Sequence, residues 1–337
     1  MWTAIRLKAQ VLTAHGDVAG FELRDVPVPD LRPGHVLVRV AATSVNPVDC
    51  KLRRHGSGAT PQLPAVLGAD FSGCVAAVAD DVDRFIVGDQ VFGCGGGVRG
   101  LPGGALAEYL LVDSRLAARK PERLNHRESA ALPLVAITAL EGLDRARVAA
   151  GDLVLVLGGT GGVGHVVTQL ARALEARVTA TASTPERARL VVDLGAQTVA
   201  DHVRETPAEI AARVTDGRGF DVVFDASGGT DLNRSVQAAR RNGHVVVIAG
   251  KGAHDLAPLY ARGQSLHCVM ALIPMLYGEG RAAHGALLER IAGFADRGEL
   301  RPLLDDHAYT LADAPAAHRQ VEEGRALGKV VVTVAEF

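Results

Sequence analysis

Hydrophobic and polar positions follow two different periods along the chain, and the change falls near Arg127. Before this point, short runs rich in Val and Leu are separated by Pro and Gly, a pattern typical of strands joined by turns. A short helix is expected to begin at Pro47, because proline is favoured at the first helical position. Strands are predicted over residues 5–14, 21–26, 35–45, 67–78 and 107–113.

After Arg127, apolar residues recur at helical spacing between short apolar runs. A helical run, interrupted early by Pro133, is predicted over residues 130–143, and strands and helices then alternate along the chain. This alternation predicts a doubly wound parallel sheet, an α/β fold. The predicted strands span 153–157, 177–182, 222–225, 244–249 and 266–271. The predicted helices span 162–175, 185–194, 207–214 and 230–239.

The end of the chain departs from this alternation. Two helices, 280–296 and 311–323, precede an apolar strand that begins at Gly328. A strand that follows two helices cannot easily extend the parallel sheet, so we expect it to return to the N-terminal β-rich part. The first domain is therefore predicted to be discontinuous, with residues 1–127 plus 272–337 enclosing an inserted domain of residues 128–271.

A glycine-rich turn joins the predicted strand 153–157 to the helix that follows it. Five glycines fall among the seven residues from Gly158 to Gly164, and Gly159, Gly161 and Gly164 match the pattern G-x-G-x-x-G. The first glycine allows a sharp turn, the second lets a pyrophosphate approach the backbone, and the third lets the helix pack close to its strand. The start of the helix then offers free N–H groups and a positive dipole end to phosphates.

The alternative for this segment is a plain glycine-rich turn. A strand before it and a helix after it favour dinucleotide binding, because the motif acquires meaning in that context. The candidate cofactor-binding residues of the turn are Gly159, Thr160, Gly161, Gly162, Val163 and Gly164.

Composition narrows the class of protein. The 337 residues carry a formal net charge of −2, which gives no reason to expect a nucleic acid or an anionic membrane as partner. No apolar run reaches membrane-spanning length, and the N-terminal residues lack an apolar signal core. Four cysteines lie far apart and form no C-x-x-C motif. We therefore expect a cytoplasmic protein without disulfides.

Several motifs, spread over nearly the whole length, resemble those of one family. They are the glycine turn and the segments Ser44-Val-Asn-Pro-Val-Asp-Cys-Lys-Leu-Arg, Leu67-Gly-Ala-Asp-Phe-Ser-Gly, Val87-Gly-Asp-Gln-Val-Phe-Gly, Ala130-Ala-Leu-Pro-Leu-Val-Ala-Ile-Thr-Ala-Leu and Gly328-Lys-Val-Val-Val. The chain resembles the zinc-free quinone oxidoreductases of the medium-chain dehydrogenase/reductase superfamily, the group that includes zeta-crystallin. The resemblance implies a Rossmann doubly wound parallel sheet inserted in a GroES-like β-barrel domain, with NADPH in a cleft between the two domains.

The same resemblance bears on metal binding. In the alcohol dehydrogenases of this superfamily, a catalytic zinc takes a Cys near the position of Asn46 and a His from a Gly-His-Glu motif that here reads Gly68-Ala69-Asp70. Asn46 and Ala69 supply neither a thiolate nor an imidazole, and the four closely spaced cysteines of a structural zinc are missing. We expect no metal. Without a Lewis acid, alcohol oxidation is disfavoured, and reduction of an electrophilic quinone or conjugated enone is favoured.

The end of the second strand of the predicted parallel sheet, residues 177–182, indicates which nicotinamide cofactor binds. An acid at this place hydrogen-bonds the ribose 2′-OH and repels a 2′-phosphate, whereas this strand ends in Thr-Ala-Ser-Thr. Ser183 and Arg187 suit NADPH, and by family alignment Arg187 falls where a basic residue meets the 2′-phosphate. The alternative for Arg187 is a solvated helix residue. His202 falls where relatives often carry a Tyr beside the adenosine phosphate, and this departure leaves its role open.

The resemblance supplies three candidate catalytic residues, Asn46, Asp49 and Lys51. Asn46 is a candidate donor to the cofactor or to a substrate carbonyl. Lys51 falls where some relatives have Tyr, and it is a candidate for stabilising an anion or delivering a proton; the alternative is a solvated lysine on a helix. Asp49 has the alternative of a structural role in fixing the loop. Quinones need little acid catalysis because the charge formed on reduction is delocalised.

The remaining candidate cofactor contacts come from the resemblance and, for Ser227 and Gly250, from their place after the parallel strands. Thr138 is expected to back the nicotinamide, with a buried threonine bonding its own helix as the alternative. Ser227 and Gly250 follow two of the parallel strands and should border the cofactor, unless they belong to ordinary loops. Lys329 is expected to reach the cofactor from the last strand, and Asn46 completes the set.

We therefore expect an NADPH-dependent, zinc-independent reductase that transfers hydride to quinones or conjugated enones. One alternative is a reductase of another activated alkene, such as an enoyl thioester or alkenal. Another is a non-catalytic, crystallin-like NADPH-binding protein. A homodimer is expected by analogy, because the strand near residues 266–271 can pair edge to edge with its mate.

Overall fold

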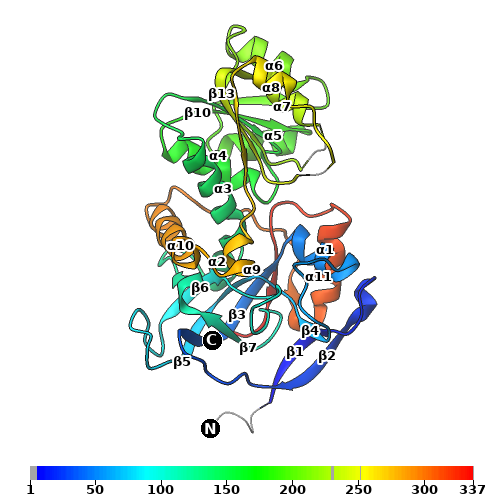
Figure 1. Cartoon of the computed structure of the whole chain (residues 1–337), viewed down its shortest axis with the longest axis vertical. Helices are drawn as coiled ribbons and strands as arrows, with labels where there is room; N and C mark the ends of the chain where they lie inside the picture. Colours follow the sequence, from blue (N-terminus) through cyan, green and yellow to red (C-terminus); the bar gives the residue numbers. More distant parts are fainter. Residues whose placement is uncertain (1–5, 229–230, 251, 337) are drawn as a thin grey trace. The chain divides into compact units, whose positions relative to one another are not determined.

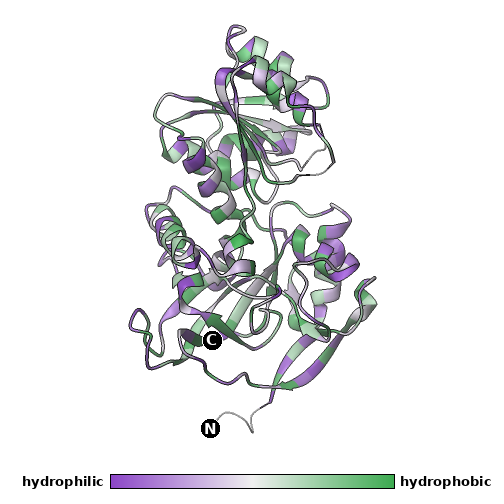
Figure 2. Ribbon diagram, viewed as in Figure 1, coloured by the Kyte–Doolittle hydropathy of each residue, from purple (hydrophilic) through white to green (hydrophobic). Residues whose placement is uncertain are grey.

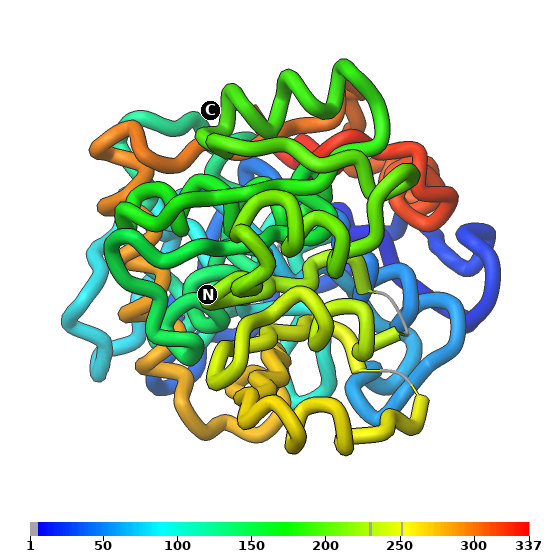
Figure 3. Tube along the Cα trace, turned by 90° about the horizontal axis from the view of Figure 1, so that it is seen from above, coloured from blue at the N-terminus to red at the C-terminus, as the bar shows by residue number. Residues whose placement is uncertain are grey.

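The computed structural model describes residues 6–228, 231–250 and 252–336. The chain divides into two compact units, which we describe separately (Figure 1). The first comprises Met1–Leu134 with Leu272–Phe337, and the second comprises Val135–Ala271. Figure 3 follows the second unit as a tube that passes from green to yellow.

The first unit is built on two sheets. The larger has the strand order β15-β16-β3-β5-β6-β8, with β7 also paired to β3, and the smaller has the order β2-β1-β4. The larger sheet contains β3 (His35–Val45), β5 (Asp70–Val78), β6 (Gln90–Cys94), β7 (Tyr109–Asp113), β8 (Ala117–Arg119), β15 (Tyr309–Thr310) and β16 (Val330–Thr333). The smaller contains β1 (Arg6–Leu12), β2 (Phe21–Pro27) and β4 (Ala65–Val66). The predicted β-rich character of this part is therefore confirmed, although residue 5 of the first predicted strand lies outside the described residues.

The last strand returns to the first unit, as predicted. β16 pairs antiparallel with β3, with Val330 opposite Val45 and Thr333 opposite Ala42. Val330, Val331 and Val332 are all buried, so the strand packs on both faces. Burial on both faces is the reason for its continuous apolar sequence.

Three helical segments of the first unit lie close to predicted positions, namely those expected to begin at Pro47 and to span 280–296 and 311–323. Proline at the first turn starts α1 (Pro47–His55), and the predicted helix 311–323 is a 3₁₀ turn, η3 (Leu311–Asp313), followed by α11. The other helical segments are η1 (Val18–Gly20), η2 (Ser114–Leu116), α2 (His126–Ala130), α9 (Ile273–Tyr277), α10 (Arg281–Asp296) and α11 (Ala314–Glu322). Of these, α10 corresponds to the predicted helix 280–296, whereas η1, η2 and α9 were not predicted.

The helical run predicted over residues 130–143, with an early interruption at Pro133, is broken in the structure. α2 ends at Ala130, and a separate helix, α3 (Pro133–Arg145), begins at the proline. Proline has no N–H and its ring clashes with the preceding turn of a helix, so it begins a new helix instead of continuing the old one.

The second unit is a six-stranded parallel sheet with the order β11-β10-β9-β12-β13-β14. The doubly wound sheet predicted from the sequence is thus confirmed, and two of its strands match the predicted bounds. β11 was not predicted, because it is four residues long and ends in Asp201. β13 begins five residues earlier than predicted and ends two residues earlier. The strands are β9 (Leu153–Leu157), β10 (Arg177–Ala182), β11 (Thr198–Asp201), β12 (Phe220–Asp225), β13 (Ala239–Val247) and β14 (Ser265–Cys268).

Helices cover the sheet of the second unit. They are α4 (Gly164–Ala173), α5 (Pro185–Asp193), α6 (Pro207–Val214), α7 (Leu232–Ala238) and α8 (Ala257–Ala261), together with most of α3. Ile210, Val236 and Leu259 of α6, α7 and α8 join one core with Leu155 and Val223 of the strands. Figure 2 shows the strands coloured mainly as hydrophobic, with polar residues on helices and loops. Residue 230, where the predicted helix 230–239 begins, lies outside the described residues.

Candidate functional site

The glycine turn lies between β9 and α4 and is held by Thr181 at the end of β10. The Gly158 N–H donates to the Thr181 hydroxyl over 2.8 Å, and the Gly159 N–H donates to the Thr181 carbonyl over 3.1 Å. A Cβ at Gly164 would lie only 2.0 Å from the carbonyl oxygen of Gly158. The third glycine of the motif is therefore required by the close approach of the helix start to the end of the strand.

The start of α4 presents unused donors. In the described part of the chain, the amides of Gly162, Val163 and Gly164 donate no hydrogen bond, and Val163 provides no side-chain cap. A Cβ at Gly161 would meet just one atom within 4 Å, the Gly158 carbonyl oxygen. The backbone is thus open to a ligand at this glycine. Free N–H groups at a helix start with an open approach fit the pyrophosphate of a dinucleotide.

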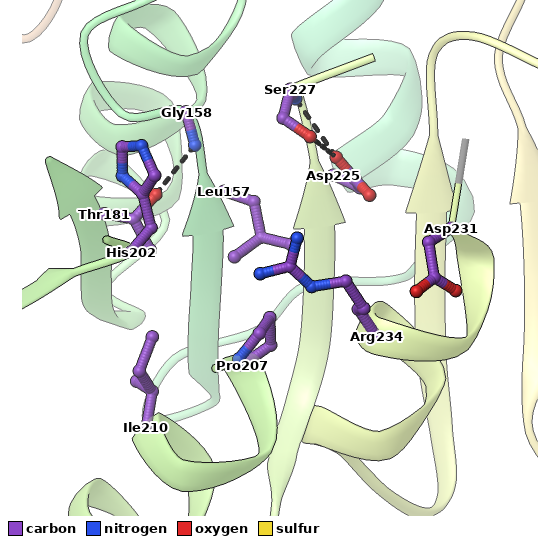
Figure 4. A pocket seen from close by; sticks show the side chains of 10 residues that line it. All are labelled: Leu157, Gly158, Thr181, His202, Pro207, Ile210, Asp225, Ser227, Asp231 and Arg234. Carbon is purple, nitrogen blue, oxygen red and sulfur yellow. Dashed lines mark hydrogen bonds between the residues drawn. The ribbon is translucent and has the colours of Figure 1, made fainter. Parts of the chain in front are cut away.

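A cavity of about 320 Å³ adjoins this turn (Figure 4). It is lined by residues at or just after the ends of four parallel strands and by residues at the starts of α6 and α7. The lining residues are Leu157, Gly158, Thr181, His202, Pro207, Ile210, Asp225, Ser227, Asp231 and Arg234. Ligands of doubly wound folds bind beyond the carboxyl ends of the strands, which is where these residues lie.

The structure brings together some of the predicted cofactor residues of the second unit. His202 and Ser227 line the same cavity as Gly158, at the end of the glycine turn. Gly250 lines a second, smaller cavity of about 70 Å³. Ser183 lies in the turn between β10 and α5, and Arg187 lies in the first turn of α5; neither residue lines either cavity. The predicted Thr138 is buried in α3.

A buried polar cluster lies in the first unit, at the end of β3 and the start of α1. The Asp70 carboxylate accepts hydrogen bonds from the Ser44 hydroxyl over 2.7 Å, from the Asn46 amide over 2.8 Å and from the Leu134 N–H over 2.8 Å. The Lys329 ammonium lies 3.5 Å from Asp70 and donates to the Asn46 side-chain oxygen. Asp70, Asn46 and Lys329 are at most 3% exposed. The carboxylate and the ammonium therefore compensate each other in a dry site.

Asp49 belongs to the same cluster, but its carboxyl group has fewer hydrogen-bond partners than that of Asp70. One of its oxygens accepts the Asn46 N–H over 2.8 Å, while the other is buried and has no partner among the described residues. Burial, with a contribution from the negative charge of Asp70, raises the pKa of Asp49 to about 7. A protonated, neutral Asp49 is thus accessible near neutral pH.

The third candidate catalytic residue stands apart from this cluster. Lys51 lies on the exposed side of α1, whereas Asn46 and Asp49 are 1% exposed. The structure brings Asn46 and Asp49 together with Lys329. Lys329 directly precedes β16, the last strand, from which it was expected to reach the cofactor.

Sequence reasoning missed Asp70, Thr181, Asp225 and Arg234 as members of these sites. Asp70 appeared in the Gly68-Ala69-Asp70 motif, but the motif was considered for its missing histidine alone. The remaining three follow or end parallel strands, or begin the next helix. That placement is a usable signal once the strand order is known.

Metal ligands are not assembled by the described residues. No group of three or more His, Cys, Asp or Glu side chains in the described ranges has the arrangement of a metal site. The four cysteines are all free, and two of them, Cys50 and Cys94, are buried. None of the described helices has the length and apolar content needed to cross a membrane.

The raised pKa of Asp49 predicts a pH-dependent stability. Its pKa in the folded chain lies above its ordinary value near 4, so folding favours the protonated form, and its contribution to stability falls as the pH rises from about 4 to about 7. Asp49→Asn removes this titration. Between pH 5 and pH 8 the unmodified chain should lose roughly 5 °C in melting temperature relative to Asp49→Asn, measured by calorimetry. The exposed Asp30→Asn is the control. Parallel melting curves for Asp49→Asn and the unmodified chain would contradict the assignment.

Comparison with known proteins adds to this geometry. Residues 32–122 match the family model of the alcohol dehydrogenase GroES-like domain, and residues 194–332 match the model described as zinc-binding dehydrogenase. These matches confirm the predicted GroES-like domain beside the parallel sheet.

Individual relatives are similar over nearly the whole chain. The NADPH-dependent alkenal/one oxidoreductase of Arabidopsis thaliana is 33% identical over 97% of this chain and 79% of its own length. The quinone oxidoreductase of Sus scrofa is 31% identical over 91% of this chain and 92% of its own. The crystal structure of an alcohol dehydrogenase superfamily protein from Novosphingobium aromaticivorans is 43% identical, with a TM-score of 0.92 over 98% of this chain and 100% of that chain. The chain therefore belongs to the zinc-free quinone oxidoreductases of the medium-chain dehydrogenase/reductase superfamily, a family of NAD(P)-dependent oxidoreductases.

Proposed function

We propose that the protein is an NADPH-dependent, zinc-independent reductase that transfers hydride to quinones or conjugated enones. The observation that carries this proposal is the open backbone cradle at Gly161 to Gly164, which adjoins a cavity large enough for part of a nucleotide. The relatives named above as quinone and alkenal/one oxidoreductases support the substrate class.

The second unit is proposed to hold the cofactor. The amides of Gly162, Val163 and Gly164 bind the pyrophosphate, and the adjoining cavity takes the adenosine end. His202 and Ser227 line this cavity, and Gly250 borders the next one along the strand ends. When bound, the reduced nicotinamide ring supplies the hydride. Binding through backbone donors fixes the position of the phosphates without any side-chain charge.

NADPH is proposed over NADH because the tip of β10 carries no acid. β10 ends at Ala182 and is followed by Ser183, while Arg187 lies half-buried in the first turn of α5. The nearest acid, Glu186, is drawn towards the start of its own helix, where backbone and Thr184 hydrogen bonds lower its pKa. Its charge is therefore partly compensated by the helix start.

Zinc independence rests on the residue types at the expected ligand positions. Asn46 and Ala69 provide no thiolate or imidazole, and the Asn46 amide is bonded to Asp70 and Lys329. The positive charge of the cluster comes from the ammonium of Lys329, which is already paired with Asp70. The free thiols of all four cysteines support a reducing, cytoplasmic compartment.

At the acceptor end we propose Asn46 and Asp49 as the chemical groups, with Lys51 and Lys329 contributing positive charge. Asn46 keeps a second amide N–H for a carbonyl oxygen, because one N–H suffices for Asp70. Burial raises the pKa of Asp49 to about 7, so a protonated form is accessible near neutral pH, and one Asp49 oxygen has no partner among the described residues. Both groups favour an acceptor oxygen that gains negative charge.

A second candidate, reduction of an alkenal, is favoured by the name of the Arabidopsis relative. The substrates share one chemistry, a carbon–carbon double bond conjugated to a carbonyl.

We also propose a homodimer formed through β14, which is an edge strand of the parallel sheet and is partly exposed.

The dimer predicts a specific mass in solution. Light scattering at micromolar concentration should give twice the 35.2 kDa of one chain, because pairing two β14 edges buries unpaired backbone groups. A mass of one chain over the same concentration range would exclude the dimer.

The activity is tested by following oxidation of NADPH and of NADH with purified, metal-analysed protein. The acceptors are 1,4-benzoquinone, 9,10-phenanthrenequinone, a simple enone and an alkenal, with a protein-free reaction as the control for direct reduction. We expect turnover with NADPH in protein that contains no zinc. Stoichiometric zinc together with alcohol oxidation would refute the proposal, and cofactor binding without turnover would point to a non-catalytic role.

The cofactor preference predicts an asymmetric effect of Arg187→Glu. Replacing a cation with an anion beside the 2′-phosphate should weaken NADPH binding at least about tenfold more than NADH binding, measured by fluorescence titration. Arg189→Glu is the matched control, because Arg189 lies in the same helix and is exposed. Equal losses for the two cofactors would show that Arg187 does not read the phosphate.

A further inference from the structure

Arg234 occupies an unusual position at the large cavity of the second unit. It lies in the first turn of α7, and Figure 4 shows its guanidinium extended across the cavity towards Leu157 and Pro207. The side chain is exposed, so it is accessible to a ligand that enters the cavity.

The guanidinium of Arg234 has no protein partner in the described ranges. Asp231 precedes it by three residues, a spacing at which helical side chains can pair. However, Asp231 accepts the N–H of Asn233 over 3.1 Å, and in Figure 4 the guanidinium points away from it. Because the Arg234 side chain points away from Asp231 and extends over the cavity, its guanidinium is available to a ligand.

The second acid of the cavity is also occupied. One oxygen of Asp225 accepts the N–H and the hydroxyl of Ser227, over 3.1 and 2.6 Å. Its other oxygen accepts the Ser235 hydroxyl over 2.9 Å. The carboxylate thus binds its own loop and α7, and among the described residues no hydrogen bond joins it to Arg234.

The wall that Arg234 faces is apolar. Leu157 is 7% exposed, and Pro207 and Ile210 are buried at the start of α6. A slot with aliphatic side chains on one side and a planar cation on the other fits a flat aromatic ring. Guanidinium groups stack on such rings, and this stacking does not depend on a charge carried by the ring.

The neighbouring residues indicate which ring this is. The cavity reaches Gly158, where the phosphate cradle begins, and Thr181 at the end of the second strand of the fold, beside which the adenosine ribose lies in dinucleotide-binding folds. We propose that Arg234 stacks on the adenine ring of the bound dinucleotide and presses it against Leu157 and Pro207. This inference rests on the proposed cofactor site, and it gives Arg234 a role distinct from the reading of the 2′-phosphate by Ser183 and Arg187.

Binding calorimetry tests the inference without any catalytic assay. The probes are ADP, NADH, NADPH and reduced nicotinamide mononucleotide, which lacks adenine. Arg234→Ala should weaken ADP, NADH and NADPH by a similar factor of about ten. The affinity for reduced nicotinamide mononucleotide should not change. Arg234→Lys should stay weakened, because it keeps the charge but loses the plane.

The matched control is Arg204→Ala. Arg204 is 84% exposed, lies two residues after His202 and pairs with Asp201 outside the cavity lining. Its removal changes the net charge equally and should leave all four affinities unchanged. Melting curves establish that each variant is folded.

The outcomes separate the two proposals. If the unmodified protein binds ADP and the dinucleotides but Arg234→Ala binds them equally well, the stacking inference is overturned and the cofactor proposal stands. A loss confined to NADPH, or full recovery with Arg234→Lys, would assign Arg234 to a phosphate and overturn stacking. If the unmodified protein binds none of the adenine nucleotides, both proposals fall.

Discussion

The first unit depends on the compensation of one buried carboxylate. Asp70 has no exposed surface, and it is bonded to Ser44, Asn46 and the backbone of Leu134 beside the ammonium of Lys329. These partners come from the end of β3, the start of α3 and the residue before β16, so a single charge connects segments that are remote in the sequence. Breaking a buried ion pair by removing one partner costs about 3–5 kcal/mol. The cluster is therefore stable when complete and costly when any member is lost.

The second carboxylate of the cluster shows what incomplete compensation does. Asp49 is as deeply buried as Asn46, but one of its oxygens has no partner in the described structure, and the negative charge of Asp70 adds to its desolvation. One ammonium cannot balance two buried carboxylates, so the less satisfied of the two takes up a proton. The cluster as a whole then stays near neutrality, and a proton is held beside Asn46, in the loop to which we assign acceptor chemistry.

The sequence predicted those features that depend on local pattern. β9 and β10 were placed at their observed bounds, because each is an apolar run bounded by turns or charged residues. β11 was missed because four residues carry too little periodicity. The interruption of the helical run 130–143 was predicted at Pro133, because proline disrupts a continuing helix, and α3 begins at this residue. Asp70 and Arg234 were missed for another reason. What we assign to them rests on partners, or on a lack of partners among the described residues, that only the three-dimensional structure reveals.

The same contrast explains why the cofactor end is readable from sequence while the acceptor end is not. Phosphate binding uses backbone N–H groups, and the close approach of Gly164 to Gly158 excludes a side chain there, so the requirement appears directly as glycines at fixed spacing. For the acceptor end we propose side chains such as Asn46 and Lys329, whose contact spans 283 positions and leaves no local signature. Relatives that share about a third of this sequence are accordingly named for different acceptors, a quinone in one and an alkenal or enone in another. These different names agree with our proposal that side chains around the cofactor turn, and not the turn itself, set the choice of substrate.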